Sequence, residues 1–144
     1  MSNPGTVPTI ADDMSPHSPR PLALLVEDEV IFRLGVESIL DEAGYDVVEA
    51  GTVAEALPHL DGGREVVLLL TDVRMPGAQD GFALARLASE RHPSLAIVVV
   101  SAAVTPRPGD MPEGATFLEK PFTSRRLDAA IAGSRAARGG SRPA

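Results

Sequence analysis

The sequence predicts an α/β protein in which helices cover both faces of a parallel, doubly wound β-sheet. From Leu22 onward, short apolar runs alternate with segments whose apolar residues recur at helical spacing, which is the pattern of repeated βαβ units. The third and fourth runs are almost entirely apolar, as expected for strands that are covered on both faces. The five predicted strands are LALLV (22–26), YDVVEA (45–50), VVLLLT (66–71), LAIVVVS (95–101) and ATFLE (115–119).

The first two runs are each followed by a predicted helix. Segment 31–43 carries its apolar residues on one face and ends before Gly44, a residue type that favours helix C-termini. Thr52 and Glu55 have the spacing of a capping box for the second helix. Pro58 falls inside that helix and should shorten or kink it, because proline has no backbone N–H to donate.

The second half of the chain predicts two helices and one gap. Segment 81–92 has helical spacing and stops at Pro93, and Thr123 or Ser124 can cap the last helix. Segment 102–114 lies where a doubly wound fold places its fourth helix, yet it contains three prolines. Each interior proline costs a helix roughly 3 kcal/mol. We therefore expect the fourth helix to be short or missing.

Composition limits the classes of function. A chain of 144 residues has room for one domain, and the absence of cysteine excludes disulfides, thiolate metal sites and a cysteine nucleophile. The formal net charge of −7 argues against nucleic-acid binding, which depends on clustered cations. No run of about 18 apolar residues suggests a membrane span. We expect a cytoplasmic protein, a monomer or weak dimer, with neither membrane nor nucleic acid as partner.

The two ends of the chain differ in composition from its centre. Residues 1–21 are rich in proline and have no apolar period, which predicts a flexible leader. Residues 133–144 are rich in Gly, Ser, Ala and Arg and predict a flexible tail that frays, with solvated arginines. The folded domain is expected to span residues 22–132.

Polar side chains follow four of the predicted strands. They are Glu27, Asp28 and Glu29 after the first strand, Asp72 after the third, Ser101 at the end of the fourth, and Lys120 after the fifth. Taken singly, each has a common structural explanation, such as a helix cap, a turn residue or a surface cation. Ligands of open parallel sheets, however, bind beyond the carboxyl ends of the strands. Carboxylates that converge there repel one another, and the usual resolution is a hard dication such as Mg²⁺.

Four sequence blocks resemble the signature blocks of response regulator receiver domains of two-component signalling. They are LLVEDEV, LLLTDVRMPG, VVVSA and FLEKPF, and the resemblance covers residues 22–132. It implies a flavodoxin-like fold with five parallel strands in the order 2-1-3-4-5 and helices on both faces. It also implies that Asp72 is the phosphoacceptor. Mg²⁺ would then be held by Glu27, Asp28, Asp72 and the backbone carbonyl of Arg74.

The resemblance implies roles for three further side chains. Lys120 is expected to neutralise charge on the phosphoryl group, and Ser101 to bind that group after transfer as a switch hydroxyl. Phe117 matches the switch aromatic of the family, although it can equally be a core residue. Glu29 is expected only to begin a helix.

Three features depart from the family pattern. The loop MPGAQDG has one residue more than the common form, and Glu27 replaces the commoner aspartate. The proline-rich segment 102–114 puts the family's usual output surface in doubt.

The expected function is that of a single-domain response regulator rather than an enzyme with an external substrate. It would accept a phosphoryl group from a histidine kinase or a histidine phosphotransfer protein and signal to an unknown downstream protein. The alternative is a receiver fragment of a hybrid histidine kinase or a phosphorelay carrier. A phosphorylation-independent interaction module is less favoured, as is an aspartyl-nucleophile phosphohydrolase, whose second aspartate would fall at Arg74.

Overall fold

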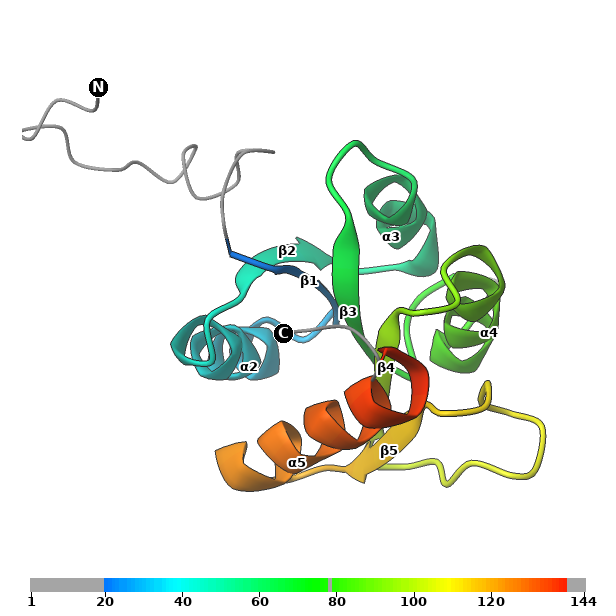
Figure 1. Cartoon of the computed structure of the whole chain (residues 1–144). Coiled ribbons are helices and arrows are strands. Elements are labelled where there is room, and N and C mark those ends of the chain that lie inside the picture. Colours follow the sequence, from blue (N-terminus) through cyan, green and yellow to red (C-terminus); the bar gives the residue numbers. More distant parts are fainter. Residues whose placement is uncertain (1–19, 78, 140–144) are drawn as a thin grey trace, which may run out of the picture.

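The computed structural model of the chain describes residues 20–77 and 79–139. Its strands form a single parallel sheet in the order β2-β1-β3-β4-β5 (Figure 1). The predicted five-stranded, flavodoxin-like topology is therefore confirmed. The strands are β1 (Leu22–Val26), β2 (Asp46–Ala50), β3 (Val66–Asp72), β4 (Ala96–Ser101) and β5 (Thr116–Glu119).

Helices cover both faces of the sheet. Residues of α2 and α5 are buried in one hydrophobic cluster, and residues of α3 and α4 are buried in the other. The helices are α2 (Val30–Glu42), α3 (Val53–Leu60), α4 (Gly81–Arg91) and α5 (Ser124–Ser134), and a π-helical turn, η1 (Arg135–Gly139), follows. No helix within the described ranges has both the length and the apolar character needed to cross a bilayer.

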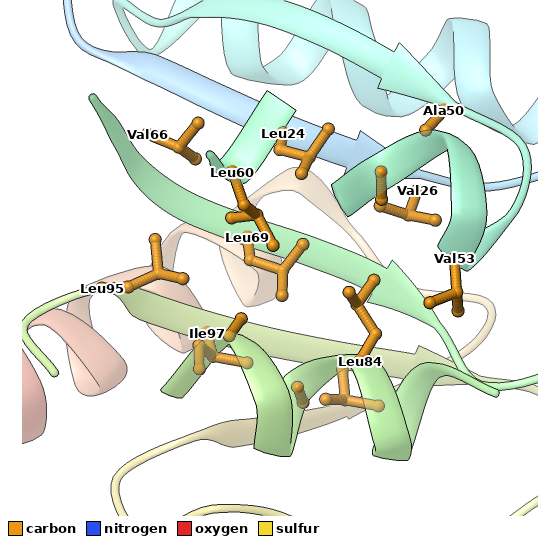
Figure 2. Packing of buried hydrophobic residues seen from close by; sticks show 14 of the residues in the cluster. Leu24, Val26, Ala50, Val53, Leu60, Val66, Leu69, Leu84, Leu95 and Ile97 are labelled. Carbon is orange, nitrogen blue, oxygen red and sulfur yellow. The ribbon is translucent and has the colours of Figure 1, made fainter. Parts of the chain in front are cut away.

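The central strands alternate between the two clusters. In β1, Leu24 faces α3 and α4, whereas Leu25 faces α2 and α5. Figure 2 shows strand side chains, among them Leu24, Leu69 and Ile97, packed with residues of the covering helices. Every residue of β1 and β4 is buried, which explains why their sequences are so apolar.

The predicted helix starts are present. The Thr52 hydroxyl accepts a hydrogen bond from the Glu55 backbone N–H (3.1 Å), and the Glu55 carboxylate accepts one from the Gly51 N–H (2.8 Å). Pro58 lies inside α3, which is only eight residues long. Of the two candidate caps of the last helix, Thr123 is the residue that caps α5.

No helix forms between β4 and β5, so the expected gap is confirmed. Residues 102–115, hereafter the β4–β5 loop, run beside the sheet as turns and extended chain (Figure 1). Asp110 holds the loop in place, because its carboxylate accepts the Arg107 N–H (2.7 Å) and its carbonyl accepts the Arg86 guanidinium (2.7 Å).

Residues 133–139 of the predicted tail are helical in the described part of the chain. Helix α5 continues to Ser134, whose buried hydroxyl accepts the Ile97 N–H (2.9 Å) and donates to the Gly114 carbonyl (2.8 Å). In η1, the Arg138 guanidinium donates to backbone carbonyls of two loops, those of Leu95, Glu113, Pro93 and His92. These hydrogen bonds stabilise the turn, and their acceptors are distant from Arg138 in sequence. Residues 140–144 lie outside the described part.

The ordered chain also begins before Leu22. The Arg20 guanidinium donates to the carbonyls of Gly44 (3.1 Å) and Tyr45 (2.6 Å). Arg20 and Pro21 therefore belong to the folded domain, and the rest of the predicted leader, residues 1–19, lies outside the described residues.

Candidate functional site

The carboxyl ends of four neighbouring strands form one edge of the sheet. The parallel registers pair Val26 with Thr71, Asp72 with Val100, and Ser101 with Glu119. Residues that follow these strands are therefore held side by side by the backbone ladders. The structure places the predicted polar residues at this edge.

Lys120 joins two of the predicted acids. Its ammonium Nζ lies 3.0 Å from Glu27 Oε1 and 3.3 Å from Asp72 Oδ2. The Lys120 side chain is only 13% exposed. Groups from the ends of β1, β3 and β5 thus meet at one place, as the strand-end pattern predicts.

Three carboxylates gather beside this lysine. Glu27, Asp28 and Asp72 each offer an oxygen, and these oxygens lie within 4.8 Å of one another. Mg²⁺ binds oxygen ligands at about 2.0–2.1 Å in octahedral geometry, so opposite ligands are about 4.2 Å apart. The donor type therefore fits Mg²⁺, and the spacing suits a site in which one carboxylate reaches the ion through a retained water.

Glu27 is the most buried of the three acids. Its side chain is 1% exposed, and its second oxygen, Oε2, accepts the backbone N–H of Glu29 (3.0 Å). Burial raises the pKa of Glu27, although the hydrogen bonds from Glu29 and Lys120 oppose this effect. Both carboxylate oxygens thus have partners in the protein, and Glu27 orients Lys120 as well as facing the acidic cluster.

Lys120 is held as a cation. Burial alone would lower its pKa, but the hydrogen bond to Glu27 and the negative charges of Asp72 and Glu27 outweigh burial and raise the pKa. The ammonium also lies over the ring of Phe32, 3.9 Å from the ring centroid. A permanent positive charge is therefore fixed beside the Asp72 carboxylate.

Asp72 is buried at the end of β3, and its backbone is packed tightly. Its Oδ1 accepts the Val73 N–H (2.8 Å), and Oδ2 faces Lys120. The Gly81 N–H donates to the Val73 carbonyl (2.8 Å), so the start of α4 lies against the backbone that follows Asp72. The sequence reasoning did not single out Gly81. The feature of the sequence that could have pointed to Gly81 is the Asp80-Gly81 pair, with which the helix begins.

Ser101 and Phe117 lie on the β4–β5 side of the site. The buried Ser101 hydroxyl oxygen accepts the N–H groups of Ala103 and Val104, both at 3.1 Å. Phe117 is half-buried and packs against the same cluster as Val104. The serine therefore anchors the start of the β4–β5 loop, and the switch roles of both residues stay predictions.

Arg74 lies in the loop that follows β3. Its side chain is exposed and lines an open pocket with Met75, Asp80 and Arg86. The expected role of its carbonyl as a metal ligand stays a prediction. Glu29 immediately precedes α2, as expected for a residue that begins the helix.

The arrangement suits transfer of a phosphoryl group to a carboxylate. A buried aspartate can act as the nucleophile, while an ammonium and an oxygen-rich dication site neutralise charge on the phosphoryl oxygens. Catalysis of such a transfer depends on position and electrostatics, which are the properties this edge of the sheet provides.

Comparison with known proteins identifies the family of this chain. A family model described as "Response regulator receiver domain" matches residues 23–132. The sensor kinase CckA of Brucella abortus is 38% identical over 110 residues, which cover 72% of this chain and 11% of CckA. The transcriptional regulatory protein PdtaR of Mycobacterium tuberculosis is 35% identical over 115 residues, 75% of this chain and 53% of PdtaR. The chain thus spans a minor part of CckA and about half of PdtaR.

Solved structures share the fold. A response regulator receiver protein from Sinorhizobium medicae has a TM-score of 0.73 at 32% identity, covering 83% of this chain and 98% of that chain. The receiver domain of NtrX from Brucella abortus has a TM-score of 0.65 at 29% identity, covering 78% of this chain and 97% of that one. Both are receiver domains by description, and both match the described fold over most of their length.

Proposed function

Since the chain belongs to the response regulator receiver family, we propose that Asp72 accepts a phosphoryl group and that the acyl phosphate changes the shape of the protein. The observation that carries this proposal is the meeting of Asp72 Oδ2 with the Lys120 ammonium (3.3 Å) beside an acidic cluster. The proposed donor is a phosphohistidine of a histidine kinase or of a histidine phosphotransfer protein.

In the transfer step, the Asp72 carboxylate attacks phosphorus in line with the histidine nitrogen. The new O–P bond forms as the N–P bond breaks, and the imidazole keeps the electron pair and takes a proton. Lys120 donates N–H bonds to the phosphoryl oxygens, while Glu27 holds the ammonium in place. Mg²⁺ held by Asp28, Asp72 and the Arg74 carbonyl, with Glu27 facing it, would supply further neutralisation of charge.

The conformational signal is proposed to start at Ser101. Its oxygen accepts two backbone N–H groups and still has its own proton to donate to a phosphoryl oxygen. A serine drawn toward Asp72 takes the start of the β4–β5 loop with it, because Ala103 and Val104 are bonded to that oxygen. Phe117 packs against the same hydrophobic cluster as Val104, so a movement of Val104 can make room for the ring to turn.

An exposed apolar patch next to the site suits the proposed protein donor. Val30, Ile31 and Leu34 on α2 are 53%, 78% and 55% exposed. Their helix starts two residues after Asp28, so the patch adjoins the acidic cluster. Exposed apolar side chains grouped in this way favour contact with a partner protein. A partner docked here would bring its phosphohistidine close to Asp72.

A receiver unit within a hybrid kinase or a phosphorelay carrier is the second candidate, because similarity to the sensor kinase CckA extends over 72% of this chain. The site chemistry is the same in both cases, and only the donor and the recipient of the signal differ. In either context the proposed role is signalling in the cytoplasm, not turnover of an external substrate. The match to the receiver family favours this signalling role over a phosphohydrolase.

The test is phosphorylation by acetyl phosphate, a small donor that needs no docking partner. With Mg²⁺ present, intact-mass measurement should show addition of one phosphoryl group to the full chain, and EDTA should abolish it. Asp72→Asn should remove the reaction. Asp128→Asn, which changes an exposed aspartate on α5, is the matched control and should react normally. Phosphorylation that survives Asp72→Asn would contradict the proposed acceptor.

A further inference from the structure

We propose that Phe32 is a positioning residue for the reaction: the face of its ring fixes the Lys120 ammonium against Asp72. The inference rests on the proposed function and extends it to an aromatic side chain that follows the first strand. The sequence pattern places Phe32 merely on the apolar face of a helix.

The contact is direct and well placed. Lys120 Nζ lies over the Phe32 ring at 3.9 Å from the centroid, within the range where the negative face of an aromatic ring attracts a cation. The same ammonium is 3.0 Å from Glu27 and 3.3 Å from Asp72. The ring thus covers a side of the cation that the two carboxylates do not.

The ring is itself held in place. Phe32 and Phe122 form an edge-to-face pair with centroids 5.5 Å apart and an interplanar angle of 88°. Phe122 comes two residues after Lys120, so the segment that carries the lysine also braces the ring beneath it. Edge-to-face pairs are favourable because the positive edge of one ring meets the negative face of the other.

This bracing matters because lysine is a flexible side chain. Its ammonium can satisfy its donors with many oxygens, and the exposed Asp28 and solvent both lie at this edge of the site. With the ring present, an ammonium that turns away from Asp72 loses the cation–π contact. The aromatic face therefore favours the orientation that the transfer step requires.

A role in packing alone makes different predictions. Phe32 and Phe122 both pack partly against the cluster beneath α2 and α5, so loss of the ring lowers stability in either case. Only a positioning role makes the loss of rate depend on the presence of Lys120.

The experiment compares the full chain with Phe32→Leu, Phe32→Tyr, Lys120→Met and the double variant Phe32→Leu/Lys120→Met. The rate of phosphorylation by acetyl phosphate is measured with saturating Mg²⁺. Phe32→Leu is expected to lower the rate by about 2- to 30-fold, the range that cation–π energies allow. Phe32→Tyr should stay within about twofold of the unmodified chain, and Phe32→Leu should have no further effect once Lys120 is absent.

Two controls separate position from stability. Ile39→Val, which removes one methyl group from the same helix, should lower the unfolding midpoint without slowing phosphorylation. Mg²⁺ affinity, measured by calorimetry, should be the same for Phe32→Leu and the unmodified chain. A rate loss that is equal in Phe32→Leu and Phe32→Tyr, or that persists in the Lys120→Met background, would overturn the inference, as would no rate loss in Phe32→Leu.

A second readout does not depend on phosphorylation. In the resting protein, the ring should shift the ε-methylene protons of Lys120 upfield, and Phe32→Leu should abolish that NMR shift. If the shift is present but acetyl phosphate never modifies the protein, the proposed function fails and the contact is real. If the shift is absent, the positioning role fails whatever the outcome of phosphorylation.

Discussion

Gly81→Ala is the substitution that should disturb the site most directly from outside the polar cluster. A Cβ atom at residue 81 would lie 1.9 Å from the carbonyl oxygen of Asp72, 2.8 Å from its carbonyl carbon and 2.9 Å from the Cα of Val73. All three atoms belong to the backbone of the acceptor segment, so no side chain can rotate to make room.

The size of the effect follows from these distances. Ordinary contact begins at 3.4 Å, so clearing the shortest approach requires a displacement of about 1.5 Å between α4 and the end of β3. Overpacking of this kind costs about 1–3 kcal/mol or more, and the rigidity of both partners places Gly81→Ala at the upper end. A shift of about 1 Å at a reacting group can lower a rate about 100-fold. We therefore expect lower stability and much slower phosphorylation.

Urea unfolding measures the loss of stability, and the acetyl phosphate reaction measures the loss of phosphorylation rate in the same sample. Gly35→Ala is the matched control, because a Cβ there meets nothing within 4 Å and residue 35 lies inside helix α2. That variant should be about 0.5–1 kcal/mol more stable than the unmodified chain and react normally. If Gly81→Ala unfolds at the same urea concentration as the unmodified chain, the close approach described for Asp72 is wrong.

Three further changes test other parts of the structure. Arg138→Ala should cost about 1–3 kcal/mol in thermal unfolding because backbone carbonyls of two loops lose their donor, whereas Arg125→Ala, at an exposed site on α5, should cost little. The pKa of Glu37 is raised by burial and by its hydrogen bond and repulsion with Glu49, so its favourable contribution is present below pH 4.5 and is lost as pH rises through the folded-state pKa. Melting curves should therefore show Glu37→Gln more stable than the unmodified chain at neutral pH, with a gap that closes below pH 4.5. Ile31→Asp should slow transfer from a phosphorylated kinase and leave the acetyl phosphate rate unchanged, and equal rates from the kinase would contradict the docking surface on α2.

Much of the fold was predictable because its causes are local. Runs of apolar residues mark the buried strands, and Thr52 marks a helix start through a bond to a residue three positions away. Prolines in segment 102–114 remove backbone donors wherever that segment lies. The ordered turn after α5 was not predictable, because Arg138 is fixed by carbonyls more than 20 residues away in sequence. Composition alone made that segment look like a frayed end.

The site, too, has features that were predictable from the sequence and features that were not. The meeting of Glu27, Asp72 and Lys120 follows from topology, since residues after neighbouring parallel strands share one edge of the sheet. The roles of Phe32 and Gly81 depend on how side chains and backbone pack across that edge. Periodicity could assign Phe32 to a helix face, but the position of the Lys120 ammonium over its ring requires coordinates.

The balance of charge at the site decides which group can carry the signal. Glu27 and Asp72 contact the ammonium of Lys120, and Asp28 lies with them in the acidic cluster, so negative charge is in excess before any phosphoryl group arrives. The proposed phosphorylation of Asp72 would remove its carboxylate charge and add phosphoryl oxygens at the same place, so Lys120 would exchange one anionic partner for another. Its other contacts, Glu27 and the Phe32 ring, involve no atom of Asp72. We therefore expect Lys120 to keep its position, and we propose that the change of shape begins at Ser101, whose oxygen accepts backbone N–H groups at the start of the β4–β5 loop rather than within a strand.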